Sequence, residues 1–210
     1  MLLRIRGWNG LPDDARVEVD IMEAVCGINA AQPETECATF PAPAWDGGDR
    51  FMVSPRSVRA ADATRALTVN DNAYVANGQL VATLPNTINL SFPLRDKLVY
   101  VGFTDASFVV PLPGPGEIAV PLAVMTGRWP IGPATETLRF LGNCPDVAGS
   151  STLPIAEIID RALDIRADPA DDHQGLECNA ISISFTMTGY RGLYGGVGDE
   201  VVVPRAACPS

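Results

Sequence analysis

The chain has 210 residues, of which 47% are hydrophobic, so it can form one substantial core, and a single domain over residues 1–210 is predicted. Its formal net charge of −10 disfavours nucleic acid and anionic membrane surfaces as partners, because like charges repel. No apolar run approaches the ~20 residues that a membrane-spanning helix needs, so no such segment is predicted.

The N-terminal part of the chain is predicted to contain short strands separated by polar turns. Strands are expected at residues 2–5, 17–21 and 50–54, where apolar residues alternate with polar ones or β-branched residues gather. Residues 26–49 are polar and rich in proline, which favours a loop over most of this stretch. Residues 55–64 fit either a loop or one helical turn.

The stretch from Thr68 to Phe92 carries the strongest secondary-structure signal. Apolar residues alternate with polar ones along it, which predicts strands with one buried face. Asn77-Gly78 favours a tight turn between the first two strands, because both residues tolerate positive φ. A third strand is expected after Pro85-Asn86, and together the three predict a β-meander.

The C-terminal half is predicted to add further strands and two helices. Strands are expected at residues 97–103, 107–111, 117–120, 122–129, 180–187 and 200–203, and Pro121 indicates an edge strand or a bulge. A short helix is expected at residues 135–141 and a longer amphipathic helix at 152–166, whose apolar side includes Ile158 and Ile159. The predicted fold is therefore mainly β, an antiparallel, jelly-roll-like β-sandwich with one or two short packed helices.

Several short motifs occur in an order that resembles a group of bacterial proteins. These motifs are Gly7-Trp-Asn-Gly with Asp13-Asp14, Trp45-Asp-Gly-Gly-Asp49, Ala73-Tyr-Val with Gly78-Gln-Leu-Val-Ala82, Thr126-Gly-Arg-Trp129 and Cys178-Asn-Ala-Ile-Ser182. Over residues 3–190 they resemble uncharacterised secreted or lipid-anchored proteins of myxobacteria and their relatives. The resemblance implies a cell-envelope or extracellular location and a β-rich fold. It implies no activity and no catalytic residues.

The five cysteines favour disulfide bonds over metal binding or redox catalysis. None lies in a C-x-x-C pair, and several adjoin turn residues. A local bridge between Cys26 and Cys37 is predicted, which would stabilise the fold by about 3 kcal/mol. Cys144, Cys178 and Cys208 allow one further bridge and leave one thiol, and their pairing is open. This usage predicts an exported protein whose export signal lies outside this sequence.

No catalytic residue is predicted. His173 is the only histidine and stands in an acidic loop, where exposure to solvent accounts for it. The sequence has no G-x-S-x-G, P-loop, H-E-x-x-H or dinucleotide-binding motif. The alternative is a carbohydrate-active hydrolase that uses paired carboxylates at turns, for which the candidates are Asp13, Asp14, Asp46, Asp49, Asp71 and Asp105. Turn chemistry by itself also explains aspartate at these positions.

The same turns could hold a structural Ca²⁺, and no other cofactor is predicted. Calcium takes several hard oxygen ligands on a bent backbone, which makes Asp46, Asp49 and Asp71 the candidate ligands. A further acidic group lies at Asp168, Asp171 and Asp172. None of these segments has the spacing of an EF-hand.

Aromatic residues beside turns are the candidate ligand-binding residues. Trp8 with Asn9, Trp45, Tyr190 and Tyr194 all interrupt segments rich in glycine, asparagine or aspartate. A flat apolar ring beside hydrogen-bonding groups suits a glycan or a surface protein as ligand, whereas the alternative is that the tryptophans fill the ends of the core. The function predicted is an exported, non-catalytic binding or structural domain, and the sequence leaves its oligomeric state open.

Overall fold

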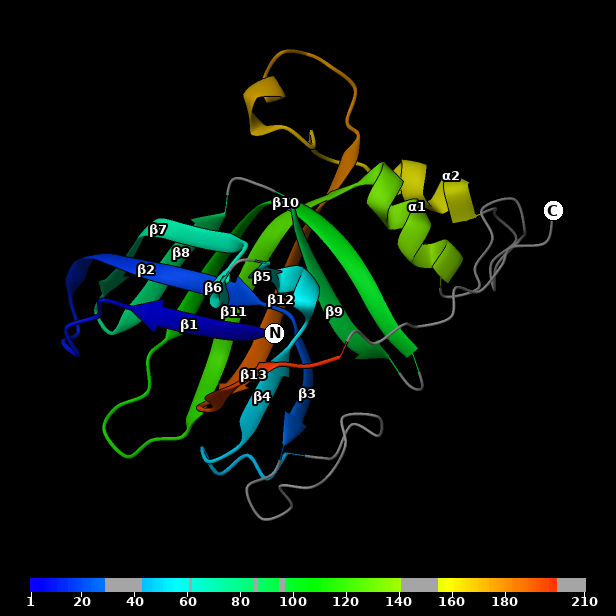
Figure 1. Ribbon diagram of the computed structural model, residues 1–210. Coiled ribbons are helices and arrows are strands. Elements are labelled where there is room, and N and C mark those ends of the chain that lie inside the picture. Colours follow the sequence, from blue (N-terminus) through cyan, green and yellow to red (C-terminus); the bar gives the residue numbers. More distant parts are fainter. Residues whose placement is uncertain (29–42, 61, 85–86, 95–96, 141–154, 200–210) are drawn as a thin grey trace. The chain divides into compact units, whose positions relative to one another are not determined.

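The computed structural model describes residues 1–28, 43–60, 62–84, 87–94, 97–140 and 155–199 (Figure 1). Most of the described secondary structure is β-strand, with two short α-helices. The strands are β1 (Leu2–Arg6), β2 (Asp14–Met22), β3 (Ala24–Ile28), β4 (Arg50–Val53), β5 (Val58–Arg59), β6 (Asp62–Ala66), β7 (Thr68–Ala76), β8 (Gln79–Leu84), β9 (Ile88–Leu94), β10 (Lys97–Pro111), β11 (Ala119–Pro130), β12 (Ala180–Tyr190) and β13 (Leu193–Val197). The helices are α1 (Ile131–Phe140) and α2 (Ile155–Ala162), and 3₁₀ turns occur at Pro55–Ser57 and Pro169–Asp171. The predicted mainly β class is confirmed.

The chain divides into two compact units. Among the described residues, unit 1 contains 1–83, 108–125 and 185–199, and unit 2 contains 84–107 and 126–184. The long strands β10, β11 and β12 each contribute residues to both units. The expectation of one domain over the whole chain stays a prediction.

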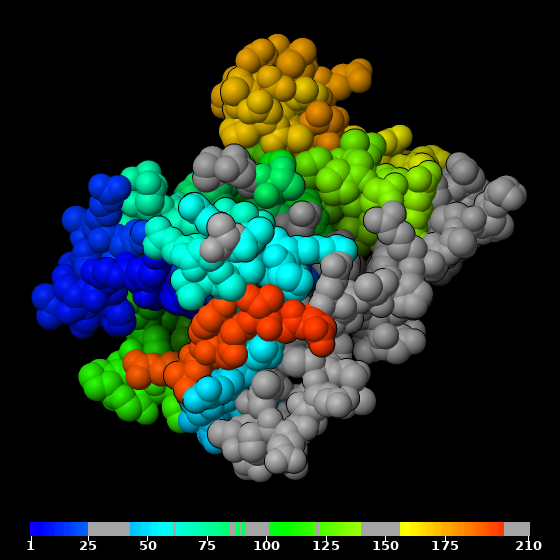
Figure 2. Space-filling model, viewed as in Figure 1, coloured from blue at the N-terminus to red at the C-terminus, as the bar shows by residue number. Residues whose placement is uncertain are grey.

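The strands form three sheets. The largest has the order β1-β2-β7-β8-β10-β11-β12, with β9 paired to β10 off this path. The pairs β1–β2, β2–β7, β7–β8 and β9–β10 are antiparallel, as predicted. A second sheet has the order β13-β4-β3, in which β3 is antiparallel to β4 and β13 is parallel to it. The surfaces of β13 and β4 lie side by side in Figure 2, and β5 with β6 forms the third sheet.

The core of unit 1 follows from the alternating pattern of its strands. Val17, Val19 and Ile21 of β2 are buried, because alternate residues of a strand point to the same face. A neighbouring cluster of buried side chains contains Met22, Val53, Val58 and Ala66, and the half-buried Leu2, Val69, Tyr194 and Val197 pack against it. These contacts join the large sheet of unit 1 to β4 and β13.

The hairpin predicted at Asn77-Gly78 is present, but the predicted meander is not. Asn77 has φ 50° and Gly78 has φ 73°, and Val75 pairs with Leu80 across the turn. The third strand, β9, pairs with β10 and not with β8. Leu94 is the register partner of Lys97, so β9 forms a closely connected hairpin with the strand that follows it.

Several predicted breaks between strands are absent. The turn expected at Thr104-Asp105 lies inside β10, where Asp105 has φ 49° and the strand continues on both sides. The irregularity expected at Pro121 falls on Leu122, which has φ 55° within β11. Since β11 lies between β10 and β12, the alternative of an edge strand is wrong. Strand β3 covers residues that were predicted to be loop, and β12 extends three residues beyond the predicted Met187.

Helix α2 ends earlier than predicted. It stops at Ala162, because the backbone beyond it pairs with β12: Asp164 N donates to Ala180 O at 3.1 Å and Ala180 N donates to Ile165 O at 3.0 Å. The helix buries Ile159, which is 5% exposed, whereas Ile158 is 42% exposed. The predicted apolar side was therefore too wide. Within unit 2, helix α2 contacts α1, and the two helices lie side by side in Figure 1.

Candidate functional site

Three loops of unit 1 meet at the end of β12. They are the loops 43–49 and 112–118 and the connection at residues 190–193, which includes the last residue of β12 and the first of β13, and we call them the loop cluster. Arg191 N donates a hydrogen bond to Ile118 O at 2.9 Å, which ties the second loop to the third through main-chain atoms. The backbone therefore holds these loops together and leaves their side chains available for other contacts.

Asp49 organises the first loop from a buried position. Its side chain is 0% exposed, and both carboxylate oxygens accept main-chain hydrogen bonds, from Ala44 N at 3.0 Å and from Trp45 N at 2.7 Å. Its carbonyl accepts a bond from Leu193 N at 2.8 Å, which ties the first loop to the third. Trp45 has φ 57°, a left-handed conformation that is uncommon for a bulky residue. The carboxylate of Asp49 thus fixes the backbone that presents Trp45.

Trp45 and Tyr190 form an exposed aromatic surface, which we call the aromatic platform. Trp45 is 46% exposed and Tyr190 is 42% exposed, with ring centroids 4.8 Å apart and an interplanar angle of 41°. Phe51 supports Trp45 with a centroid separation of 5.9 Å. The ring of Phe51 lies so close to the backbone of Gly192 that a Cβ at that position would come within 2.4 Å of it. Only glycine leaves room for this arrangement.

Polar side chains of opposite charge stand beside the platform. Glu117 Oε2 accepts a bond from Gly114 N at 2.9 Å, and Arg191 Nη2 donates to Gly114 O at 3.1 Å and to Pro113 O at 3.0 Å. Both side chains are exposed. Among the described residues, nothing bonds Glu117 Oε1 or Arg191 Nε and Nη1. These atoms are therefore available to a ligand.

The turn that follows Trp45 packs against the stem of Arg191. A Cβ at Gly47 would lie 3.6 Å from Ile118 Cγ2 and 3.9 Å from Arg191 Cβ, and Gly47 has φ 84°. Ile118 is itself 38% exposed. The loop that carries Trp45 therefore packs against Ile118 and the stem of Arg191.

The structure brings together two of the predicted ligand-binding residues and places the others elsewhere. Trp8 Nε1 donates to Leu11 O at 2.8 Å and Asn9 Oδ1 accepts from Leu11 N at 2.8 Å, so both residues close their own turn. Tyr194 packs against the core of unit 1, and its hydroxyl donates to Ala63 O at 2.7 Å. Sequence reasoning missed Phe51, Ile118 and Glu117. Alternation along β12 was the available signal for Tyr190, because Ser184, Thr186 and Thr188 share its exposed face.

The predicted calcium ligands serve turns and backbone contacts. Asp49 holds the loop as described above, and Asp46 Oδ1 accepts from Gly48 N at 2.9 Å. Asp71 is exposed on β7, and its carbonyl accepts a bond from Arg16 Nε at 3.0 Å. Within the described ranges, no group of three or more His, Cys, Asp or Glu residues is arranged to hold a metal ion. Calcium binding stays a prediction.

The cysteine pairing also stays a prediction. Cys178 is exposed and is bonded to no described cysteine. Cys37, Cys144 and Cys208 lie outside the described residues, as does the side chain of Cys26.

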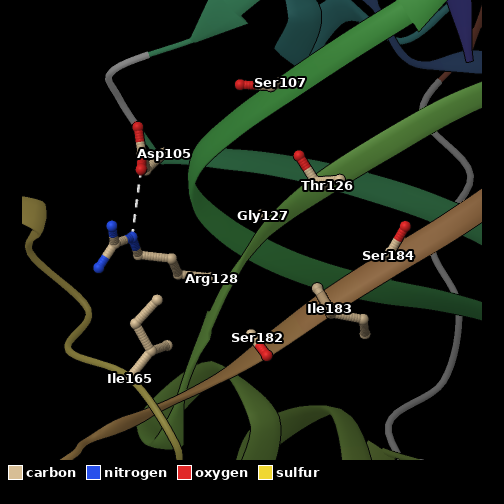
Figure 3. Close-up of a pocket in the computed structure, with 9 residues that line it drawn as sticks. All are labelled: Asp105, Ser107, Thr126, Gly127, Arg128, Ile165, Ser182, Ile183 and Ser184. Carbon is tan, nitrogen blue, oxygen red and sulfur yellow. Dashed lines mark hydrogen bonds and ion pairs between the residues drawn. The ribbon is translucent and has the colours of Figure 1, made fainter.

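A hollow in unit 2 is lined by both polar and apolar side chains (Figure 3). It is an open groove of about 430 Å³, lined by Asp105, Ser107, Thr126, Gly127, Arg128, Ile165, Ser182, Ile183 and Ser184. Arg128 Nε donates to Asp105 Oδ2 at 3.1 Å at its edge. The guanidinium also makes a bidentate pair with Asp172 at 2.9 and 2.8 Å and donates to Arg166 O at 2.9 Å. Arg128 thereby fastens the acidic loop around Asp172 to β10 and β11.

Two carboxyl groups near this groove, those of Asp164 and Asp172, have a pKa below the ordinary value of aspartate. The hydrogen bond from Arg128 lowers the pKa of Asp172 below its ordinary value. The pKa of Asp164 is lowered by hydrogen bonds from the hydroxyl and the main-chain N–H of Ser182. A general acid in glycoside hydrolysis needs a raised pKa, so these two groups are suited to accept hydrogen bonds and not to protonate a leaving group.

Comparisons with protein-family models, with curated proteins and with solved structures find no match for this chain. The predicted resemblance to secreted or lipid-anchored myxobacterial proteins is not tested by them. Among the described helices, none is long and apolar enough to cross a membrane. The functional argument therefore rests on the geometry of the loop cluster.

Proposed function

We propose that the protein is a non-catalytic domain that binds carbohydrate at the loop cluster, with Trp45 and Tyr190 stacking on sugar rings. The observation that carries the proposal is the aromatic platform itself: two rings, 46% and 42% exposed, lie 4.8 Å apart, and a buried carboxylate fixes the loop that carries Trp45. A pyranose ring has an apolar C–H face and hydroxyl groups around its edge. Such a ring matches an aromatic surface with hydrogen-bonding groups beside it.

The rigidity of the platform favours binding. Asp49 holds the main chain of Trp45, and the ring of Phe51 packs against the ring of Trp45. A side chain that is already ordered loses little conformational entropy when a ligand binds. The alternative that the tryptophans fill the ends of the core does not suit Trp45, because nearly half of its surface is exposed.

The proposal includes a location at the cell envelope or outside the cell, where glycans are the available ligands. Its support is the five cysteines, which have no metal-binding spacing and of which several adjoin turn residues in the sequence. Hydrolysis is not part of the proposal, because the candidate carboxylates beside the platform, Asp46 and Asp49, accept main-chain hydrogen bonds from their own loop.

A glycan array probed with the purified protein tests this function. Trp45→Ala and Tyr190→Ala should each weaken binding at least tenfold, a change of about 1.4 kcal/mol, because each removes half of the platform. Trp8→Ala is the matched control, since Trp8 bonds within its own turn and should leave affinity unchanged. Recovery of no glycan, or an equal loss of affinity in the Trp8 variant, would refute the proposal.

A further inference from the structure

We infer that the outer edge of β12 in unit 1 pairs with the same edge of a second copy of this chain, so that two copies share one continuous sheet. The inference concerns residues 185–190, the part of β12 that belongs to unit 1. In the described part of the chain, β12 is the last strand of the large sheet, with β11 on one side and no strand on the other. An edge of this kind presents unpaired N–H and C=O groups to another strand.

Hydrogen bonds near the start of β12 show which main-chain groups point to the outer edge. Ala180 N donates to Ile165 O at 3.0 Å, and Ser182 N donates to Asp164 Oδ1 at 2.7 Å. Neither acceptor belongs to β11, so the even-numbered residues point their main-chain groups away from that strand. In unit 2 this edge is thus already covered by residues 164 and 165.

The same orientation continues into unit 1. Arg191 N donates to Ile118 O at 2.9 Å, directly before β11, so an odd-numbered residue points toward that strand. Side-chain exposure alternates without a break from Ala180 to Tyr190, so no bulge shifts the pattern between the two ends. The N–H and C=O groups of Thr186 and Thr188 therefore point to the outer edge.

The sequence of β12 lacks the features that usually protect an edge strand. Residues 180–190 include no charged residue and no proline. The opposite edge of the sheet is β1, which has only five residues and carries Arg4 and Arg6. A short, charged edge resists pairing with another chain, whereas a long, regular and uncharged edge favours it.

A second copy of the chain suits this edge in charge and in symmetry. The net charge of −10 makes two copies repel each other over most approaches, and the repulsion is weakest where a strand carries no charge. In an antiparallel pair with its two-fold axis at Met187, Thr186 lies opposite the partner's Thr188. Their main-chain groups then bond in both directions, and threonine pairs are favourable across antiparallel strands.

Sedimentation velocity of the full chain over a series of protein concentrations tests the inference without any sugar. A Cys178→Ser background prevents dimers linked through that exposed thiol. We expect a monomer–dimer equilibrium that shifts toward the dimer as salt is added, because salt screens the repulsion between two acidic copies. A protein that is monomeric at every concentration, or a dimer that weakens with salt, would overturn the inference.

Hydrogen exchange identifies what covers the edge. The amides of Thr186 and Thr188 should exchange rapidly in dilute protein and become protected at concentrations where the dimer forms. Protection that is already complete in the monomer would show that another segment of the same chain covers this edge, and would overturn the inference.

Variants at the edge test the interface directly. Thr186→Pro removes an N–H that the sheet itself does not use, so the fold should tolerate it while the dimer dissociation constant rises at least tenfold. The double variant Thr186→Lys with Thr188→Lys places like charges opposite each other and should have the same effect. The control is Asn72→Lys with Thr126→Lys, which adds the same charges at exposed positions of β7 and β11, strands with neighbours on both sides. A dimer that both edge variants leave unchanged would refute this interface.

Such a dimer would make the proposed carbohydrate binding bivalent. Tyr190 is the last residue of β12, so the two platforms would lie at opposite ends of the paired strands, with the Tyr190 residues about 20 Å apart. Two sites on one rigid sheet strengthen binding to a glycan-coated surface without a new contact to sugar. This consequence rests on the proposed function, and the two can fail separately. A dimer that binds no glycan would refute the function alone, and glycan binding by a strictly monomeric protein would refute the inference alone.

Discussion

Replacing Asp49 is the most direct test of how the platform is held. The Asp49→Ala variant removes both acceptors of the main-chain N–H groups of Ala44 and Trp45. A hydrogen bond to a charged group contributes about 1.5–3 kcal/mol, so two of them set an upper range of about 3–6 kcal/mol. The freed N–H groups can bond to water once the loop opens. We therefore expect the free energy of unfolding to fall by about 3 kcal/mol.

Two measurements on Asp49→Ala distinguish local loosening from general damage. Urea unfolding gives the loss of stability, and hydrogen exchange followed by mass spectrometry should show faster exchange in peptides that cover residues 43–49. Asp49→Asn keeps one acceptor oxygen, so its free energy of unfolding and its exchange rates should lie between those of the wild type and the alanine variant. Asp46→Ala is the control, because among the described residues its side chain accepts a hydrogen bond from Gly48 alone, in an exposed turn. Unchanged stability and unchanged exchange in Asp49→Ala would refute the role assigned to this carboxylate.

Three further substitutions test other parts of the structure. Gly192→Ala places a Cβ 2.4 Å from the ring of Phe51, so it should lower the free energy of unfolding by about 1–3 kcal/mol and weaken glycan binding. At the control position Gly132, a Cβ would meet nothing within 4 Å, so Gly132→Ala should leave binding unchanged. Asp20→Ala removes a fully buried partner of Arg4 and Arg6 in β1 and should lower the free energy of unfolding by about 3–5 kcal/mol. A much smaller loss of stability would refute a structural role for this ion cluster. Because Arg128 lowers the pKa of Asp172 in the folded state, the stability that this pair provides is present above the unfolded pKa of about 3.9 and is lost as the pH falls through the folded value. Asp172→Asn should therefore destabilise the protein at neutral pH and make little difference in strong acid, and an equal loss at both pH values would contradict this assignment.

The parts of the fold that depend on nearby residues were predicted well from the sequence. The hairpin at Asn77-Gly78 forms because both residues accept positive φ and the flanking strands alternate. The end of α2 could not be predicted in this way, because Asp164 and Ile165 leave the helix to pair with Ala180, which lies far along the chain. The amphipathic pattern of the sequence continues beyond Ala162, where the helix ends because of this long-range pairing.

The candidate site shows the same division between local and distant causes. Tyr190 and Tyr194 occupy similar glycine-rich surroundings in the sequence, yet one is exposed and the other packs against the core. The difference arises because β13 pairs in parallel with β4, where Tyr194 is the register partner of Phe51. Glu117 carried no local signal, since its loop lies beside Arg191 through the main-chain hydrogen bond from Arg191 N to Ile118 O, which joins residues far apart in the sequence.

The backbone of Trp45 gives the strongest reason to regard its exposure as functional. A left-handed conformation at a bulky residue costs about 1–3 kcal/mol, and such a conformation persists only where the surroundings enforce it. Here the buried carboxylate of Asp49 enforces it through Trp45 N at 2.7 Å, and the result is a ring that is 46% exposed. A tryptophan that served only to fill the core would gain more by burying its ring than by this arrangement. The chain instead accepts a strained backbone and a buried charge in order to hold an aromatic ring at the surface, beside a second ring.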